Sequence, residues 1–211
     1  MYKFLLLLFP LLSSICSFAQ EPTASWEKGY YYNLKGNRFP GFINTYDSKN
    51  RTFAERYFFF RVNEDDNEKK VYADSVKAYV TGPDSFVVSH VFGLKRTPFV
   101  RVIIDDSVKL YESKQMVGSG TPIGGMRANK FMSVGITIPG APHQATMYCY
   151  GSNPDDLSPL GSKPFFEEMS KIFASTPALL EEIKYQEYTY KNMDDIISHY
   201  FWYKRHESKK K

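Results

Sequence analysis

Between residues 28 and 150, apolar and polar residues alternate in short runs separated by turn residues, which is the pattern of β-strands. The first two runs, 29–32 and 38–46, flank a turn at 35–37 whose Gly and Asn tolerate positive φ, so they predict an opening hairpin. The other predicted strands cover residues 52–62, 71–81, 85–92, 99–104, 108–112, 130–138 and 145–150.

Two stretches interrupt this pattern. Residues 117–125 carry four glycines and a proline and predict a mobile loop. Residues 153–163 are crowded with Asn, Asp, Ser, Gly and Pro, which indicates a boundary between two parts of the chain.

Beyond residue 163 the apolar spacing becomes that of amphipathic α-helices. Thr176 and Pro177 predict the start of the second helix, as N-cap and first helical residue. Asn192 predicts the N-cap of the third, with Asp195 reaching back from the third position. The predicted buried stripes are Phe165, Phe166, Met169, Ile172 and Phe173, with Glu167, Glu168 and Lys171 outside; Leu179, Leu180 and Ile183; and Met193, Ile196, Ile197, Tyr200, Trp202 and Tyr203.

These elements predict an α+β fold, in which an antiparallel β-rich body precedes about three C-terminal helices. The body could be a meander, a sandwich or a partial barrel. We expect a signal peptide at 1–19, the β-rich body at 20–160 and a helical subdomain at 161–211. The basic end of the chain, 204–211, suits the C-terminal end of a helix dipole and needs no ligand to explain it.

The N-terminus has the pattern of a cleaved secretion signal. Lys3 precedes a mostly apolar run at 4–12, and 17–19 place small residues one and three positions before Gln20. We therefore expect cleavage after Ala19 and export, either to the periplasm or out of the cell. No later run approaches the roughly 18 apolar residues of a membrane span, so none is expected in the mature chain.

Cys16 lies at the depth where a lipoprotein signal carries its lipidated cysteine. Lipid-transfer enzymes need a small residue just before that cysteine, whereas Ile15 is branched and bulky. Cleavage after Ala19 is therefore the favoured interpretation. It leaves Cys149 as the single cysteine, so the mature chain cannot form an internal disulfide.

Composition narrows the possible partners. A formal net charge of +4 over 211 residues is mild and dispersed, so nucleic-acid binding is not expected, and an exported protein would seldom meet nucleic acid. The 16 Tyr and 17 Phe favour strands, because flat rings pack well on a pleated surface. Aromatic richness also suits contact with carbohydrate or lipid, although core packing is its commoner cause.

Several short motifs resemble a group of uncharacterised exported bacterial proteins. Gly29 and Tyr30 open the hairpin, residues 41–43 read Gly-Phe-Ile, and Leu110 and Tyr111 end a central strand. The helical matches are Phe173, Pro177, Leu179, Ile183, Tyr188, Ile196, Ile197 and Tyr200. The resemblance implies a β-rich body with a helical tail and carries no known activity. The group often has an Asn after the late tyrosine, where this chain has Phe201.

Cys149 is the first candidate for chemistry, because a lone cysteine with a histidine elsewhere can be a nucleophile. It lies in a predicted strand without any cysteine-protease signature, so a buried, inert thiol is the favoured interpretation. His143, in a loop rich in Pro and Gly, could partner it, but sequence gives no geometry.

No metal signature is present in the sequence. His199 and His206 lie seven positions apart, whereas zinc usually needs three or four ligands, so solvated histidines are expected. Residues 64–68 gather oxygen ligands but lack the alternation and central glycine of a calcium-binding EF-hand loop, so a charged hairpin loop is expected.

Other catalytic patterns are incomplete. The glycine-rich residues 118–125 lack the Lys-Ser/Thr ending of a phosphate loop, and the chain has no Gly-x-Ser-x-Gly elbow of a serine hydrolase. The adjacent carboxylates predict turns or caps, because a glycosidase needs two acids facing across a cleft. These pairs are Asp105 with Asp106, Asp155 with Asp156, and Asp194 with Asp195.

The sequence thus predicts no catalytic, cofactor-binding or metal-binding residue. We expect an exported, non-enzymatic protein of the bacterial cell envelope with a binding or structural role, whose partner is an envelope component, a glycan or a lipid. One alternative is an envelope-polymer hydrolase in which Asp105, Asp106 or Glu112 converge only in three dimensions. Another is a glycan- or lipid-binding module that uses exposed Tyr and Trp.

Overall fold

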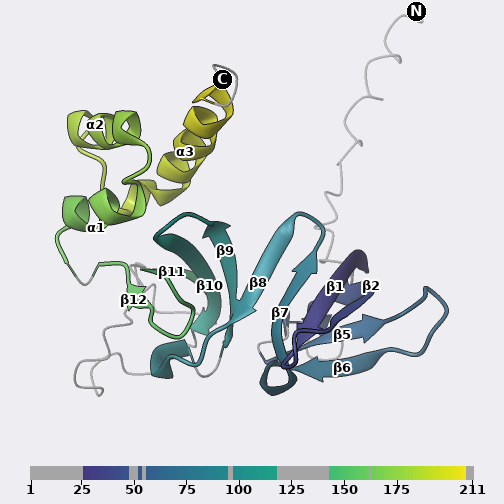
Figure 1. The fold of residues 1–211 in the computed structure, drawn as a ribbon. Helices are drawn as coiled ribbons and strands as arrows, with labels where there is room; N and C mark the ends of the chain where they lie inside the picture. Colours follow the sequence, from purple (N-terminus) through teal and green to yellow (C-terminus); the bar gives the residue numbers. More distant parts are fainter. Residues whose placement is uncertain are drawn as a thin grey trace, which may run out of the picture.

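The computed structural model describes residues 26–47, 52–53, 56–94, 97–117, 143–161 and 163–207. A ten-stranded antiparallel sheet is followed by three α-helices in this part of the chain (Figure 1), which confirms the predicted α+β fold with a β-rich body. The strand order is β12-β11-β10-β9-β8-β7-β1-β2-β5-β6, and β3 and β4 form a separate pair.

The elements have the following bounds. The strands are β1 (Glu27–Asn33), β2 (Arg38–Asn44), β3 (Tyr46–Asp47), β4 (Thr52–Phe53), β5 (Tyr57–Arg61), β6 (Lys69–Tyr72), β7 (Val76–Thr81), β8 (Asp84–Val88), β9 (Phe99–Ile104), β10 (Lys109–Val117), β11 (His143–Gly151) and β12 (Ser158–Pro159). The helices are α1 (Phe165–Ile172), α2 (Pro177–Tyr185) and α3 (Met193–Glu207), with short 3₁₀ turns at Ala73–Ser75, Phe92–Leu94 and Tyr190–Asn192.

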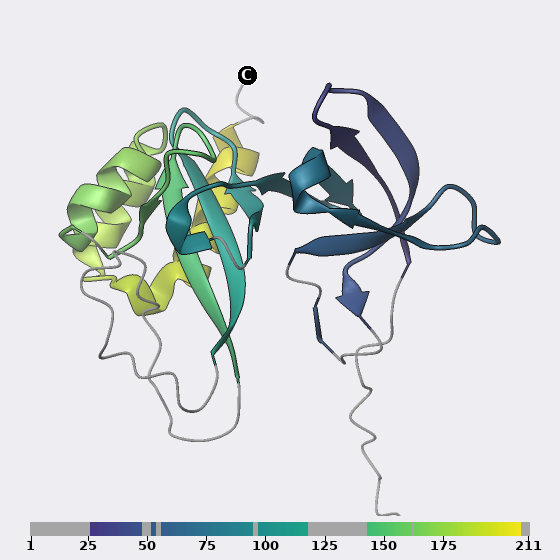
Figure 2. The same ribbon diagram turned by 90° about the horizontal axis from the view of Figure 1, so that it is seen from below.

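The sheet has two halves that share the central strand β8. Strands β1, β2, β5, β6 and β7 form one half, and β9 to β12 form the other, over which the three helices lie (Figures 1 and 2). The sheet remains continuous between them because β8 pairs with both β7 and β9.

The half without helices is filled by aromatic rings. Tyr79 stacks on Phe86 with ring centroids 4.6 Å apart and contacts Phe58 at 4.7 Å. Gly41 lets β5 approach closely, because a Cβ there would lie 2.6 Å from the Phe60 ring. Each fully buried ring of this kind contributes about 1.5–3 kcal/mol. The buried members are Tyr31, Ile43, Phe58, Phe60, Val71, Ala73, Val76, Tyr79 and Val88.

The helices cover a second core on the other half. The predicted helical stripes supply most of it, and the strands add Ile104, Leu110 and Tyr150. A third cluster includes Tyr111 and Cys149. The stripe prediction is wrong for Phe166 and Trp202, which remain exposed. The buried helical residues are Met169, Ile172, Phe173, Leu179, Ile183, Met193, Ile196 and Tyr200.

Two predicted strands, 52–62 and 71–81, need correction. Within 52–62, β4 pairs with β3 in a separate sheet, whereas β5 pairs with β2 and β6. Residues 71–81 do not form one strand, because the 3₁₀ turn Ala73–Ser75 separates β6 from β7. Ser75 stabilises that turn by donating its hydroxyl proton to the carbonyl oxygen of Tyr72 at 2.7 Å. In the predicted boundary segment 153–163, the short strand β12 pairs with β11.

The predicted start of α2 at Thr176 and Pro177 is confirmed, whereas that of α3 needs correction. Thr176 is at the N-cap of α2, but its side chain makes no capping hydrogen bond, and its buried Oγ1 has no partner among the described residues. Asn192 closes a capping box with Thr189 around the 3₁₀ turn that precedes α3, so it does not cap α3 directly. Because this turn precedes α3, the capping residues lie before the first residue of the helix, Met193.

Glu168 is the clearest departure from the predicted helical stripes. Its side chain is 0% exposed, although the sequence places it outside the stripe. It accepts hydrogen bonds from the backbone N–H groups of Gly161 and Lys163, at 2.8 and 3.1 Å, and from the Tyr190 hydroxyl at 2.7 Å. These donors replace water around the carboxylate, so it can be buried.

Some predictions fall outside the described residues. These are the signal peptide 1–19 with Cys16, the glycine-rich residues 118–125, the strand at 130–138 and residues 208–211. Within the described segments, the helices are too short or too polar to cross a bilayer.

Candidate binding cleft

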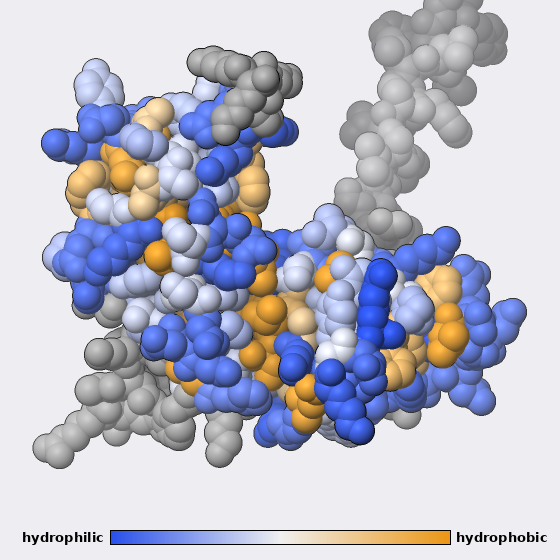
Figure 3. All heavy atoms as spheres, viewed as in Figure 1, coloured by the Kyte–Doolittle hydropathy of each residue, from blue (hydrophilic) through white to orange (hydrophobic). Residues whose placement is uncertain are grey.

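A cleft of about 360 Å³ separates α3 from the sheet. We call it the α3 cleft. It continues into a hollow of about 630 Å³ beside the C-terminal half of α3, because Ser198 and Phe201 line both. Figure 3 shows apolar residues on the part of the sheet below α3. The cleft is lined by Pro83, Asp84, Arg101, Val102, Ile103, Tyr148, Asp194, Ile197, Ser198 and Phe201.

Strand pairing places a charged group on the sheet side of the cleft. Residues directly opposite each other on antiparallel strands share a face, and Arg101 is opposite both Phe86 and Glu112. Its guanidinium forms an ion pair with Glu112, which is 6% exposed, and donates to Asp84 at 3.1 Å. Arg101 therefore neutralises a nearly buried carboxylate and a half-exposed one together.

The charges around Arg101 also affect its protonation. Burial lowers the pKa of Arg101, but Glu112 and Asp84 outweigh burial and raise it. The side chain thus stays a cation with its donors directed at two carboxylates, an arrangement that fixes its position.

Tyr148 connects the sheet to the helix above it. Its hydroxyl donates a hydrogen bond of 2.9 Å to Asp194 in the first turn of α3. Burial, together with the Asp194 carboxylate, raises the pKa of Tyr148 well above its ordinary value. The phenol is therefore a neutral donor, and Asp194 is held at the wall of the α3 cleft.

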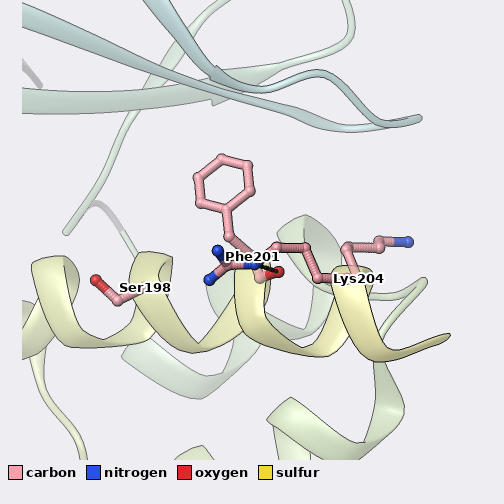
Figure 4. A pocket seen from close by; sticks show the side chains of 4 residues that line it. Ser198, Phe201 and Lys204 are labelled. Atoms are coloured by element: carbon pink, nitrogen blue, oxygen red, sulfur yellow. Dashed lines mark hydrogen bonds between the residues drawn. The ribbon is translucent and has the colours of Figure 1, made fainter. Parts of the chain in front are cut away.

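The hollow beside α3 combines an aromatic ring with cations. Phe201 is 43% exposed and points from the helix toward the strands (Figure 4). Lys204 lies 3.1 Å from the Ser175 hydroxyl and 3.7 Å from Asp106, and Arg205 donates from Nε to the carbonyl oxygen of Phe201. The hollow is lined by Ser198, Phe201, Lys204 and Arg205, so it offers an apolar ring beside polar and cationic groups and can contact a ligand that has both apolar and polar faces.

The candidate thiol is a buried side chain. Cys149 is 0% exposed and packs with Val100, Tyr111 and Met147. Burial raises the pKa of its thiol to about 12, so it is protonated at neutral pH and a poor nucleophile. The side chain of His143 lies outside the described residues, so the proposed pair stays untested.

The three carboxylates of the hydrolase hypothesis have different partners. Glu112 pairs with Arg101, and Asp105 pairs with Lys109 in a neighbouring hollow of about 300 Å³. Hydrogen bonds from Ser175 and from the Ser107 backbone lower the pKa of Asp106. The described contacts do not bring these three acids together at one site.

The other candidate groups are in ordinary structural roles. Asp155 accepts the backbone N–H of His90, and Asp66 accepts two bonds from Asn63 in the loop at 63–66. His199 contacts Glu182 at 2.6 Å, and His206 contacts the carbonyl oxygen of Trp202. In the described part of the chain, no three His, Cys, Asp or Glu side chains gather as metal ligands would.

Sequence reasoning missed Asp84, Arg101 and Tyr148. The available signal is Arg101, a charged residue in the middle of the otherwise apolar strand Phe99–Ile104. A charge at such a position needs a partner on the same face of the sheet. To identify that partner from sequence, the pairing of the strands would have to be predicted first.

Comparison with protein families, curated proteins and solved structures finds no match to this chain. The resemblance to exported bacterial proteins therefore stays a prediction.

Proposed function

We propose that this chain is an exported, non-enzymatic protein of the bacterial cell envelope that binds a glycan in the α3 cleft. The observation that carries the proposal is the half-exposed ring of Phe201, which lines the cleft together with polar side chains from three strands and a helix. A sugar ring has an apolar face that suits such a ring and hydroxyl groups that suit the surrounding donors and acceptors.

The charged groups in the cleft favour binding over catalysis. Arg101 holds both Asp84 and Glu112, and Tyr148 holds Asp194. A general acid or base needs a carboxyl group able to exchange a proton with substrate. Carboxylates with such fixed partners are better suited to orienting hydroxyl groups.

The test is binding of soluble peptidoglycan fragments and neutral oligosaccharides, measured by calorimetry on the mature protein. We expect Phe201→Ala to weaken binding at least tenfold. Tyr185→Ala is the matched control, because Tyr185 is 89% exposed on α2 and does not line the cleft. Equal binding by the two variants, or no binding by the unmodified protein, would reject the proposal.

The same incubations test the hydrolase alternative. Release of reducing ends would indicate turnover, and Asp84→Asn and Asp194→Asn would then identify whether the acids that line the cleft are responsible. Turnover abolished by either change, with the melting temperature unaltered, would replace the binding proposal with an enzymatic one.

A further inference from the structure

The half of the sheet without helices presents a second surface, away from the α3 cleft. The strand registers place three groups of directly opposite residues on one face of β1, β2 and β5. Lys28 of β1 lies opposite Phe42 of β2, which in turn lies opposite Arg61 of β5. The other two groups are Tyr30 with Pro40 and Tyr32 with Arg38, on β1 and β2. The aromatic core uses the opposite face, through Tyr31, Ile43 and Phe60. We call the first set the basic aromatic face, defined by Lys28, Tyr30, Tyr32, Arg38, Phe42 and Arg61.

Both arginines of the basic aromatic face stack on rings. The guanidinium carbon of Arg38 lies 3.8 Å from the ring centroid of Tyr30. That of Arg61 lies 4.3 Å from the Trp26 ring and 5.6 Å from the Phe42 ring. Stacking orients a planar guanidinium while leaving the N–H groups at its edge able to donate, which is a geometry suited to carboxylates.

The cations of this face lack acidic partners within the described residues. No described carboxylate lies within ion-pair distance of Lys28, Arg38 or Arg61. The Nε of Arg61 is buried and has no hydrogen-bond acceptor in that part of the structure. A buried N–H without an acceptor costs about 1–3 kcal/mol, so this N–H does not hold the guanidinium in place, and stacking on Trp26 and Phe42 orients it instead.

The spacing of the cations favours an extended ligand. Phe42 is four residues beyond Arg38 on β2 and lies opposite Arg61. At about 3.3 Å per strand residue, the two arginine positions are roughly 13 Å apart along the strand. Lys28 lies on the other side of Phe42, about 10 Å from the Arg61 position across two strand spacings. A single small anion cannot reach all three.

We propose that the basic aromatic face binds an acidic polysaccharide, whose successive carboxylates pair with Arg38, Arg61 and Lys28. This inference goes beyond the proposed glycan site, because it uses other residues and another ligand charge. Single-stranded nucleic acid needs open ring faces for base stacking, whereas Arg38 lies over the Tyr30 ring and Arg61 lies over the Trp26 and Phe42 rings. A membrane would favour protruding apolar side chains, and these rings are only partly exposed.

The test measures binding of a polyuronate oligosaccharide, with neutral dextran as the uncharged comparison. We expect salt-sensitive binding of the polyuronate, as for exposed charge pairs, and no dextran binding that depends on Arg38 or Arg61. The double variant Arg38→Gln, Arg61→Gln should bind at least tenfold more weakly. The control Lys184→Gln, Lys191→Gln removes the same charge from exposed helical positions and should stay within twofold.

Two further variants separate loss of ligand contacts from loss of folding and from binding in the α3 cleft. If the double variant has a lowered melting temperature, Arg38→Gln alone serves, because Arg38 is exposed. Phe201→Ala should leave polyuronate binding unchanged, which separates this face from the α3 cleft. Equal loss in the control variant, absence of polyuronate binding, or tighter arginine-dependent binding of single-stranded DNA or anionic vesicles would overturn the inference.

Discussion

Tyr148 of β11 donates a 2.9 Å hydrogen bond to Asp194, so the first turn of α3 is tied directly to the sheet. This contact lies at the wall of the α3 cleft and joins residues 46 positions apart in sequence. A polar contact therefore links the two parts of the fold at the cleft.

Tyr148→Phe removes that contact without changing the ring. We expect the free energy of unfolding to fall by about 1 kcal/mol, because Asp194 is exposed and water can replace the lost donor. Urea denaturation measures the change. Tyr185→Phe, on the exposed side of α2, should have no effect. A loss as large as that of a core truncation would contradict this account of Tyr148.

Ile196→Ala tests how α3 packs on the body. Ile196 is 0% exposed within the helical core, so we expect a loss of about 2–5 kcal/mol in the free energy of unfolding. Ile197→Ala is the neighbouring comparison and should cost less, because Ile197 is only partly buried. An Ile196 effect below about half a kilocalorie, typical of exposed sites, would mean that α3 is not docked.

Glu168 and Glu167 offer a pair of adjacent acids with opposite environments. Glu168→Ala leaves the backbone N–H groups of Gly161 and Lys163 without their acceptor, although the Tyr190 hydroxyl keeps the Lys163 carbonyl oxygen, so we expect a loss of about 3 kcal/mol or more. Glu167 is exposed and pairs with Lys163 and Lys171, so Glu167→Ala should change stability by less than about 1 kcal/mol. Thermal unfolding of the two variants side by side measures the difference. Similar losses would contradict the buried network.

The thiol of Cys149 predicts a pH dependence. Its pKa is about 12 in the folded chain against an ordinary value of 9.0. Above pH 9.0 the unfolded chain loses this proton while the folded chain keeps it, so the thiol's contribution to stability decreases as pH rises toward about 12. Cys149→Ala should therefore show a shallower loss of stability above pH 9.0 than the unmodified protein. Parallel pH profiles would show that the thiol titrates normally.

The elements that sequence predicts well are those with local causes. The opening hairpin follows from the turn around Gly36, which has a positive φ of 84°. The apolar stripes identify α1 and α2 because helical period is visible within a few residues. Neither feature needs information about distant parts of the chain.

The missed features depend on distant contacts. Strand β1 pairs with β7 as well as β2, and no local pattern specifies that choice. Glu168 is buried because Tyr190, from another element, donates to it. Arg101 belongs to the candidate cleft only because β9 lies beside β10 and below α3. From sequence alone a charged residue is predicted to be exposed, because the partner that allows its burial is not known.

Among the described strands, β12 and β6 lie at the two edges of the sheet, and both oppose the addition of another strand. Open edges carry backbone groups that can template aggregation, and lysines or prolines there discourage it. The β12 edge is two residues long and includes Pro159, which has no N–H to donate. At the other edge, β6 begins with Lys69 and Lys70, whose charges discourage pairing with a further strand. Neither edge favours fibre growth, so the stacked rings and cations of the neighbouring strands can be presented without the sheet extending from one molecule to the next.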